Sequence, residues 1–132
     1  MSTPRFPSGP WTGFYNYKAG GTTHPMDLHL RFHGGVMKGD GVDDVGPFLI
    51  RGHYDEGTLE ASWVKSYVNL HDVLYHGFRE GKGIWGTWNI PPWAHGGFHI
   101  WPVEEGGIEK QKQAEREVPV KAPLVPATSP AG

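Results

Sequence analysis

Residues 26–33 read MDLHLRFH, and this stretch alternates between apolar and polar side chains at every step. Met26, Leu28, Leu30 and Phe32 fall on one face of an extended chain, and the charged and imidazole side chains fall on the other. A period of two is the pattern of a β-strand with one face against a core and one face in water. This stretch therefore predicts a half-buried strand.

On both sides of residues 26–33 the same pattern recurs in short segments that Gly, Pro, Asn or Asp separate. The predicted strands are residues 11–18, 26–33, a short run from 36, 48–54, 58–67, 71–80, 84–90 and 96–102. No helix separates them, so consecutive strands are expected to pair antiparallel. Closing eight such strands in chain order removes both edges, which predicts an all-β, eight-stranded antiparallel up-and-down β-barrel (a meander). An open or sandwiched sheet of the same strands stays the alternative.

The length of 132 residues suits a single domain. Six Trp, five Tyr and six Phe bring the large buried areas that a thin β-core needs. We expect residues 1–9 to be a flexible N-terminus and residues 10–103 to form the barrel domain. Residues 104–132 are polar and then rich in Pro and Ala, so they are expected to form a disordered tail.

The composition argues against several classes of partner. A formal net charge of −2 leaves no electrostatic footprint for nucleic acid or for an anionic membrane. No apolar run approaches the roughly 20 residues of a membrane span. The chain contains no cysteine, which excludes disulfides, thiolate catalysis and cysteine zinc sites. A soluble, cytoplasmic protein without a cofactor is the expectation.

Two segments contain residues of the types that bind metal ions, but the spacing of neither predicts a metal site. His29 and His33 have helical ligand spacing but lie on a predicted strand, where they stand about 13 Å apart. Residues 40–44, DGVDD, are rich in carboxylates but lack the spacing and the closing Glu of a calcium loop. Asp and Gly are also what a turn prefers, so a turn is the expectation.

Three features resemble the avidin and streptavidin-like members of the calycin group of small β-barrels. They are the opening Gly9-Pro10-Trp11-x-Gly13, the apolar alternation that begins at Met26, and Trp88 followed by an aromatic loop before the last strand. The resemblance covers about residues 9–102 and implies a small molecule bound in the open end of the barrel. The hydroxyl and amide residues that surround biotin in that family have no counterpart in the first two strands, so biotin itself is not expected.

The segment from Lys65 to Tyr75 carries the most chemistry. Trp63 belongs inside a barrel, and alternation then places Lys65 and Tyr67 inside as well. The following hairpin returns His71 and Tyr75 to the same end. An interior Lys requires a partner or a lowered pKa, and such groups concentrate at functional sites. The alternative is that Lys65 pairs with Asp43 or Asp44 and only pins the barrel.

A binding module for an unidentified small molecule is the favoured function. The expected polar anchors are Lys65, Tyr67, His71 and Tyr75, and the expected aromatic walls are Trp11, Tyr15, Trp63, Trp88 and Trp93. One alternative is a small enzyme that uses the Lys, Tyr and His cluster for acid–base chemistry. The other is a structural homo-oligomer whose interior is filled by its own side chains.

Two tryptophans alternate out of phase with the predicted core. If Trp88 and Ile100 point inward, Trp85 and Trp101 point outward on the barrel wall. Exposed tryptophan usually has a partner surface. We therefore expect a homo-oligomer that associates through the wall near these two residues, with cover by the segment around Ile108 as the alternative.

Overall fold

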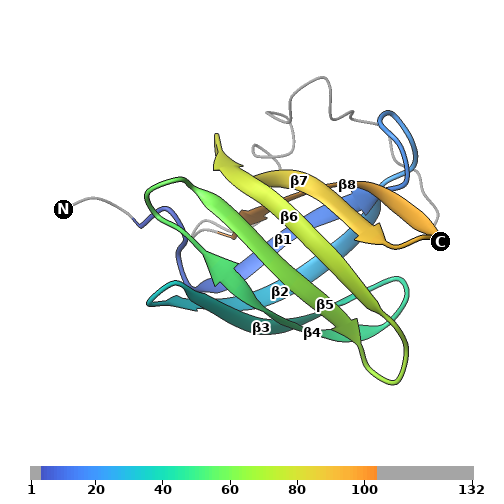
Figure 1. Ribbon diagram of the computed structural model, residues 1–132, viewed down its shortest axis with the longest axis horizontal. Coiled ribbons are helices and arrows are strands. Elements are labelled where there is room, and N and C mark those ends of the chain that lie inside the picture. The colour runs from blue at the N-terminus through green and yellow to red at the C-terminus, as the bar shows by residue number, and fades with distance from the viewer. Residues whose placement is uncertain (1–3, 104–132) are drawn as a thin grey trace.

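The computed structural model describes residues 4–103, which form a closed eight-stranded antiparallel barrel with the strands in chain order (Figure 1). The predicted meander is therefore confirmed. The strands are β1 (Gly9–Asn16), β2 (His24–His33), β3 (Val36–Asp43), β4 (Pro47–Tyr54), β5 (Glu60–Tyr67), β6 (Asp72–Glu80), β7 (Gly83–Ile90) and β8 (Ala94–Pro102). The predicted tail, residues 104–132, lies outside the described residues. Within the described part of the chain, no helix is long and apolar enough to span a membrane.

Each strand pairs with its neighbours in the chain, and β1 pairs with β8 to close the barrel. The loops after β1, β3, β5 and β7 gather at one end, on the right of Figure 1. The loops after β2, β4 and β6 gather at the other end, together with the described N-terminal segment. We call these the odd-loop end and the even-loop end.

Inward-facing side chains fill the barrel. The alternation seen in residues 26–33 holds in β2, where Leu28 and Leu30 are buried and the residues between them are exposed. Aromatic rings supply much of the rest: Trp63 stacks on Tyr75 with ring centroids 5.3 Å apart, and Phe98 packs against both. The interior is a packed core along most of its length.

Glycines on the inner face make room for these rings. A Cβ added at Gly41 of β3 would lie 2.6 Å from the ring of Phe48 and 2.3 Å from the carbonyl oxygen of Asp27. The strand was expected to end before this point, because Gly39 and Gly41 resemble turn residues. They are instead strand residues whose missing side chains let the neighbouring strand and ring approach, so β3 runs on to Asp43.

Gly41→Ala is expected to destabilise the fold by about 1–3 kcal/mol, the usual cost of overpacking a core. The added methyl group would displace either the Phe48 ring or the β2 backbone. Urea denaturation followed by tryptophan fluorescence measures the effect. An unchanged midpoint would mean that the space around Gly41 is wider than these contacts indicate.

Phe6 closes the even-loop end of the barrel. Its side chain is buried, and its ring lies 5.4 Å from that of Phe32 and 4.9 Å from that of Tyr54. Trp11 holds the same segment, because its indole Nε1 donates a 2.9 Å hydrogen bond to the carbonyl of Pro7. The sequence assigned residues 1–9 to a flexible segment, but Phe6 belongs to the core. Phe6 lies between Pro4 and Pro7, outside any alternating segment, so no pattern predicted its burial.

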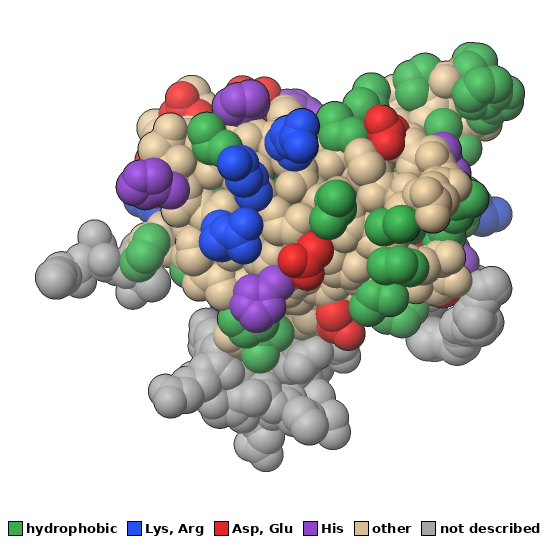
Figure 2. All heavy atoms as spheres, turned by 90° about the horizontal axis from the view of Figure 1, so that it is seen from below, with side chains coloured by type: hydrophobic (Ala, Val, Ile, Leu, Met, Phe, Trp, Pro, Cys, Tyr) green, Lys and Arg blue, Asp and Glu red, His purple; other side chains and the backbone are tan. Residues whose placement is uncertain are grey.

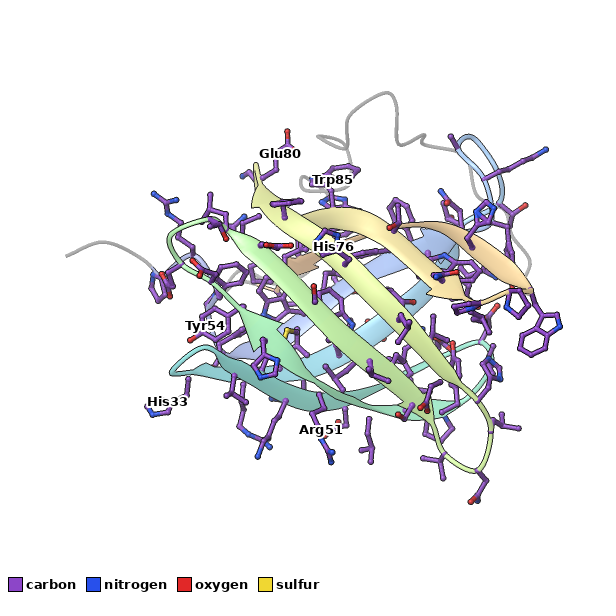
Figure 3. All side chains as sticks on the ribbon, viewed as in Figure 1. His33, Arg51, Tyr54, His76, Glu80 and Trp85 are labelled. Carbon is purple, nitrogen blue, oxygen red and sulfur yellow. The ribbon has the colours of Figure 1, made fainter. Side chains whose placement is uncertain are left out.

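The outer wall of β7, β8 and β1 carries a second aromatic cluster. The imidazole of His99 stacks on Trp85 with ring centroids 3.5 Å apart, and its centroid lies 4.6 Å from that of Trp101. Trp85 points away from the barrel axis (Figure 3), as its alternation predicted. Trp85 is nevertheless half-buried, and Trp101 is only 2 % exposed. Association through this wall stays a prediction.

His99 makes the stability of this wall depend on pH. Burial lowers the pKa of His99 to about 3. Since an unfolded His titrates near pH 6.5, the unfolded chain binds this proton more readily than the folded one between pH 6.5 and 3. The contribution of the neutral ring is complete above pH 6.5 and is lost as the pH falls through this window.

We expect His99→Phe to remove this part of the acid sensitivity while it keeps a ring against Trp85. The wild-type free energy of unfolding should fall between pH 6.5 and 4 by at most about 1.4 kcal/mol per pH unit more than that of the variant. Urea titrations at a series of pH values measure both. Parallel pH profiles for the two proteins would contradict the burial of a neutral His99.

Candidate functional site

Lys65 points into the barrel, as the alternation around Trp63 predicted. It lies on β5, where it is opposite Ile50 of β4 and Val73 of β6, and it is 1 % exposed. Both opposing residues are themselves part of the buried core. A lysine here is removed from water and requires compensation.

Asp43, at the end of β3, provides that compensation. Its Oδ2 lies 2.6 Å from the Lys65 Nζ, and the Asp43 side chain is 0 % exposed. The ammonium also lies 3.8 Å from the Met26 sulfur. Four rings surround it at 4.7 to 5.1 Å from Nζ to centroid: Phe48, Tyr15, Tyr67 and Tyr75. The cation is therefore held by one carboxylate and a cage of aromatic faces.

These contacts have opposite effects on the pKa of Lys65. Burial lowers the pKa of Lys65, and the charge and hydrogen bond of Asp43 raise it, with the net effect downward. The sequence named Asp43 and Asp44 as the alternatives for this partner. The structure selects Asp43, because it is the inward-facing residue at the end of β3.

Tyrosine hydroxyls extend the network toward the odd-loop end. Tyr67 donates a 2.6 Å hydrogen bond to Asp43 Oδ2, and Tyr15 donates a 2.6 Å hydrogen bond to Asp44 Oδ1. His24 Nδ1 lies 2.6 Å from the other Asp44 oxygen. Burial is the largest cause that raises the pKa of both tyrosines, and their carboxylate partners raise it further. Both phenols therefore remain protonated at neutral pH.

Asp44 differs from a simple buried carboxyl. Burial raises its pKa, but the hydrogen bonds from Tyr15 and His24 lower it more, so the net shift is downward. Asp44 is thus a carboxylate at neutral pH, and its two acceptor oxygens orient one tyrosine and one histidine. Asp43 and Asp44 together organise the polar groups at this end.

A small cavity of about 90 Å³ opens at the odd-loop end above this network. Its lining is mainly aromatic: Tyr15, Tyr17, Val45, Tyr67, His71, Val73, Tyr75, Trp88 and Ile90. Tyr75 is 3 % exposed, and its hydroxyl makes no hydrogen bond to any residue in the part of the chain that the structure describes. Burial, followed by the charge of Asp43, raises the pKa of Tyr75 well above its usual value.

The structure brings four of the seven predicted site residues to this cavity: Tyr67, His71, Tyr75 and Trp88. Lys65 lies beneath the cavity rather than in its wall. Trp63 lies deeper in the core, stacked on Tyr75. Trp93 is 80 % exposed in the loop after β7 and does not line the cavity. Of the other proposed walls, Tyr15 lines the cavity, and Trp11 packs against Phe32, which contacts Phe6 at the far end.

Sequence reasoning missed Tyr17 and His24. Tyr17 follows β1, and its ring lies 5.2 Å from Trp88 and 5.5 Å from His24. The predicted first strand had placed Tyr17 on the same face as Tyr15, which was the available signal. His24 precedes the alternating segment of β2, so no pattern marked it.

The carboxylate-rich segment is not the turn that was expected. Asp40 and Asp43 belong to β3, and Asp43 is committed to Lys65 and Tyr67. Asp43 also accepts a 2.9 Å hydrogen bond from the backbone of Val45, which shapes the connection to β4. Among residues 4–103 no three His, Asp or Glu side chains group in a way that could hold a metal ion.

Comparisons with models of protein families, with curated proteins and with solved structures give no match to this chain. The likeness to the calycin group therefore rests on the architecture alone, an eight-stranded antiparallel barrel. The odd-loop end is where polar side chains and a cavity lie together.

Lys65→Met is expected to destabilise the protein by about 3–5 kcal/mol, because it leaves the Asp43 carboxylate buried without its cation. Adding Asp43→Asn should recover much of that loss, since the remaining amide carries no charge. Lys18→Met, at an exposed turn position, is the control and should shift stability by no more than about 0.5 kcal/mol. Denaturant titration compares the variants, and a neutral Lys65→Met would show that Asp43 reaches water.

Proposed function

We propose that the barrel is a binding module for a small neutral molecule with a planar carbonyl group, which enters the cavity at the odd-loop end. The single observation that carries the proposal is the hydroxyl of Tyr75. It belongs to a nearly buried residue in the cavity wall and has no hydrogen-bond partner among residues 4–103. The oxygen of this hydroxyl is not among the fully enclosed polar atoms of residues 4–103 that lack a partner, so it is open to the cavity. Its O–H is free to donate a hydrogen bond to an acceptor on a ligand.

The charges around the cavity favour a neutral ligand. Asp43 and Asp44 are both committed to hydrogen bonds at its floor and rim, and Lys65 already pairs with Asp43. An anion would meet the repulsion of Asp44, and Tyr15 and Tyr67 cannot donate to it, because their hydroxyls already donate to Asp44 and Asp43. A carbonyl oxygen accepts a hydrogen bond without bringing charge.

The size of the cavity favours a small group. A volume of about 90 Å³ is below the roughly 300–1,000 Å³ of pockets that enclose a drug-sized ligand. Only a small head group fits between the rings, and the remainder of a larger ligand would extend through the mouth. Trp88 and Tyr15 both line the cavity and contact each other edge to face, with ring centroids 6.0 Å apart, so this part of the wall is aromatic. The avidin-like resemblance is part of this proposal, since those barrels bind small molecules at the open end.

An enzymatic role is less well supported by the same contacts. The Lys65 ammonium lies under the tyrosine rings, so a substrate in the cavity would not touch it. The raised pKa values of Tyr15, Tyr67 and Tyr75 disfavour a phenolate base. A barrel filled by its own side chains is also what a structural homo-oligomer without a ligand would have. The binding experiment below separates that alternative from the binding module.

Binding of 2-pyrrolidinone, a small cyclic amide, provides the test, followed by NMR chemical shifts of the residues that line the cavity and by the intrinsic tryptophan fluorescence of the protein. The wild-type protein should bind it saturably and should bind acetate, an anion with the same acceptor type, more weakly. Tyr75→Phe should weaken amide binding about threefold to tenfold, because one hydrogen bond is lost.

Tyr54→Phe is the matched control, since it removes the same hydroxyl at the even-loop end, where Tyr54 is labelled in Figure 3. It should leave amide binding unchanged. Equal affinity in all three proteins, or no saturable binding by the wild type, would contradict the proposal and favour the scaffold.

A further inference from the structure

Three cationic side chains form one row across the outer face of β2, β3 and β4. Arg31 lies directly opposite Lys38, and Lys38 lies directly opposite Arg51. All three are exposed, and Arg51 points away from the barrel (Figure 3). Because neighbouring strands are about 4.8 Å apart, the three backbone positions fall within about 10 Å.

This arrangement is unfavourable for the isolated barrel. Like charges directly opposite one another on neighbouring strands destabilise a sheet. No ion pair within residues 4–103 joins any of the three cations to a carboxylate. The row also takes three of the 12 Lys and Arg residues of a chain whose net charge is negative. An anion bound between these side chains would reverse the repulsion.

The row borders a shallow hollow of about 440 Å³ in the barrel wall. Its other lining residues include Leu49, which is 58 % exposed, together with Val64 and Ser66. Asp72 is the one carboxylate among its lining residues. Figure 2 shows Lys and Arg side chains gathered on the face seen there, with hydrophobic side chains beside them.

We propose that this hollow binds a small organic phosphate ester, with the phosphate held by Arg31, Lys38 and Arg51. Guanidinium groups bind phosphate oxygens in pairs, and an ammonium between them adds a third charged donor. The apolar surface of Leu49 and Val64 would contact the organic part, and the Ser66 hydroxyl offers a further hydrogen bond. The volume lies in the range of pockets for ligands of this size.

The chemistry of this hollow differs from that of the cavity at the odd-loop end. It lies on the outer wall and shares no lining residue with that cavity. It favours an anion, whereas the cavity favours a neutral group. Each site is therefore tested without reference to the other.

Titration with phenyl phosphate, followed by NMR chemical shifts of β3 and β4, tests the proposal. The wild-type protein should bind phenyl phosphate more tightly than inorganic phosphate. Arg51→Gln should weaken phenyl phosphate binding about tenfold or more, since it removes charge-assisted hydrogen bonds. Lys18→Gln removes the same charge from a distant exposed turn and should have little effect.

Leu49→Ser distinguishes an ester site from a simple cationic surface. It should weaken binding of phenyl phosphate several-fold and leave inorganic phosphate unchanged. Equal losses of affinity for phenyl phosphate in Arg51→Gln and Lys18→Gln would show that binding depends only on net charge, and would overturn the proposal. Binding of a long polyanion such as heparin without binding of phenyl phosphate would also overturn it, because the row would then serve a macromolecule.

Discussion

The ion pair between Lys65 and Asp43 is the contact on which the odd-loop end depends. Neither side chain reaches water, so each requires the other, and their position fixes how β3 approaches β5 across the intervening β4. Tyr67 hydrogen-bonds to the same carboxylate, and four rings pack around the ammonium. Removing one partner would strand a charge in an apolar environment. The pair therefore positions Tyr67, whose ring is part of the cavity wall.

The two ends of the barrel are closed by different kinds of contact. At the even-loop end, Phe6 packs against Phe32 and Tyr54, and the end is apolar. At the odd-loop end, carboxylates and phenols hydrogen-bond to one another and leave a small space above them. Inside a small barrel with a filled interior, space is left only where the packing stops, and here that is at the end lined by tyrosines.

Much of this arrangement could be predicted from alternation alone. The period of two in residues 26–33 identified β2, and the same rule applied from Trp63 placed Lys65 and Tyr67 inside. Strand order followed from short connections. These features are local or nearly so, and a sequence records them directly.

The remainder depends on contacts between segments far apart in the chain. Gly39 and Gly41 looked like turn residues because the rings and backbone that approach them come from other strands. Phe6 showed no pattern because one side chain has no period. Trp93 is exposed because of the direction of a loop, which alternation does not specify. Pairwise geometry of this kind also selected Asp43 over Asp44.

The seam between β1 and β8 has a consequence for biosynthesis. All other pairings join strands that follow one another in the chain, so each can form soon after its second strand leaves the ribosome. One edge of β1 must wait for β8, the last of the eight strands of the barrel to be made, before its backbone groups find partners. During translation that edge is open to pairing with another nascent chain. The feature that leaves the finished barrel without edges thus makes its first strand the most vulnerable part of the unfinished one.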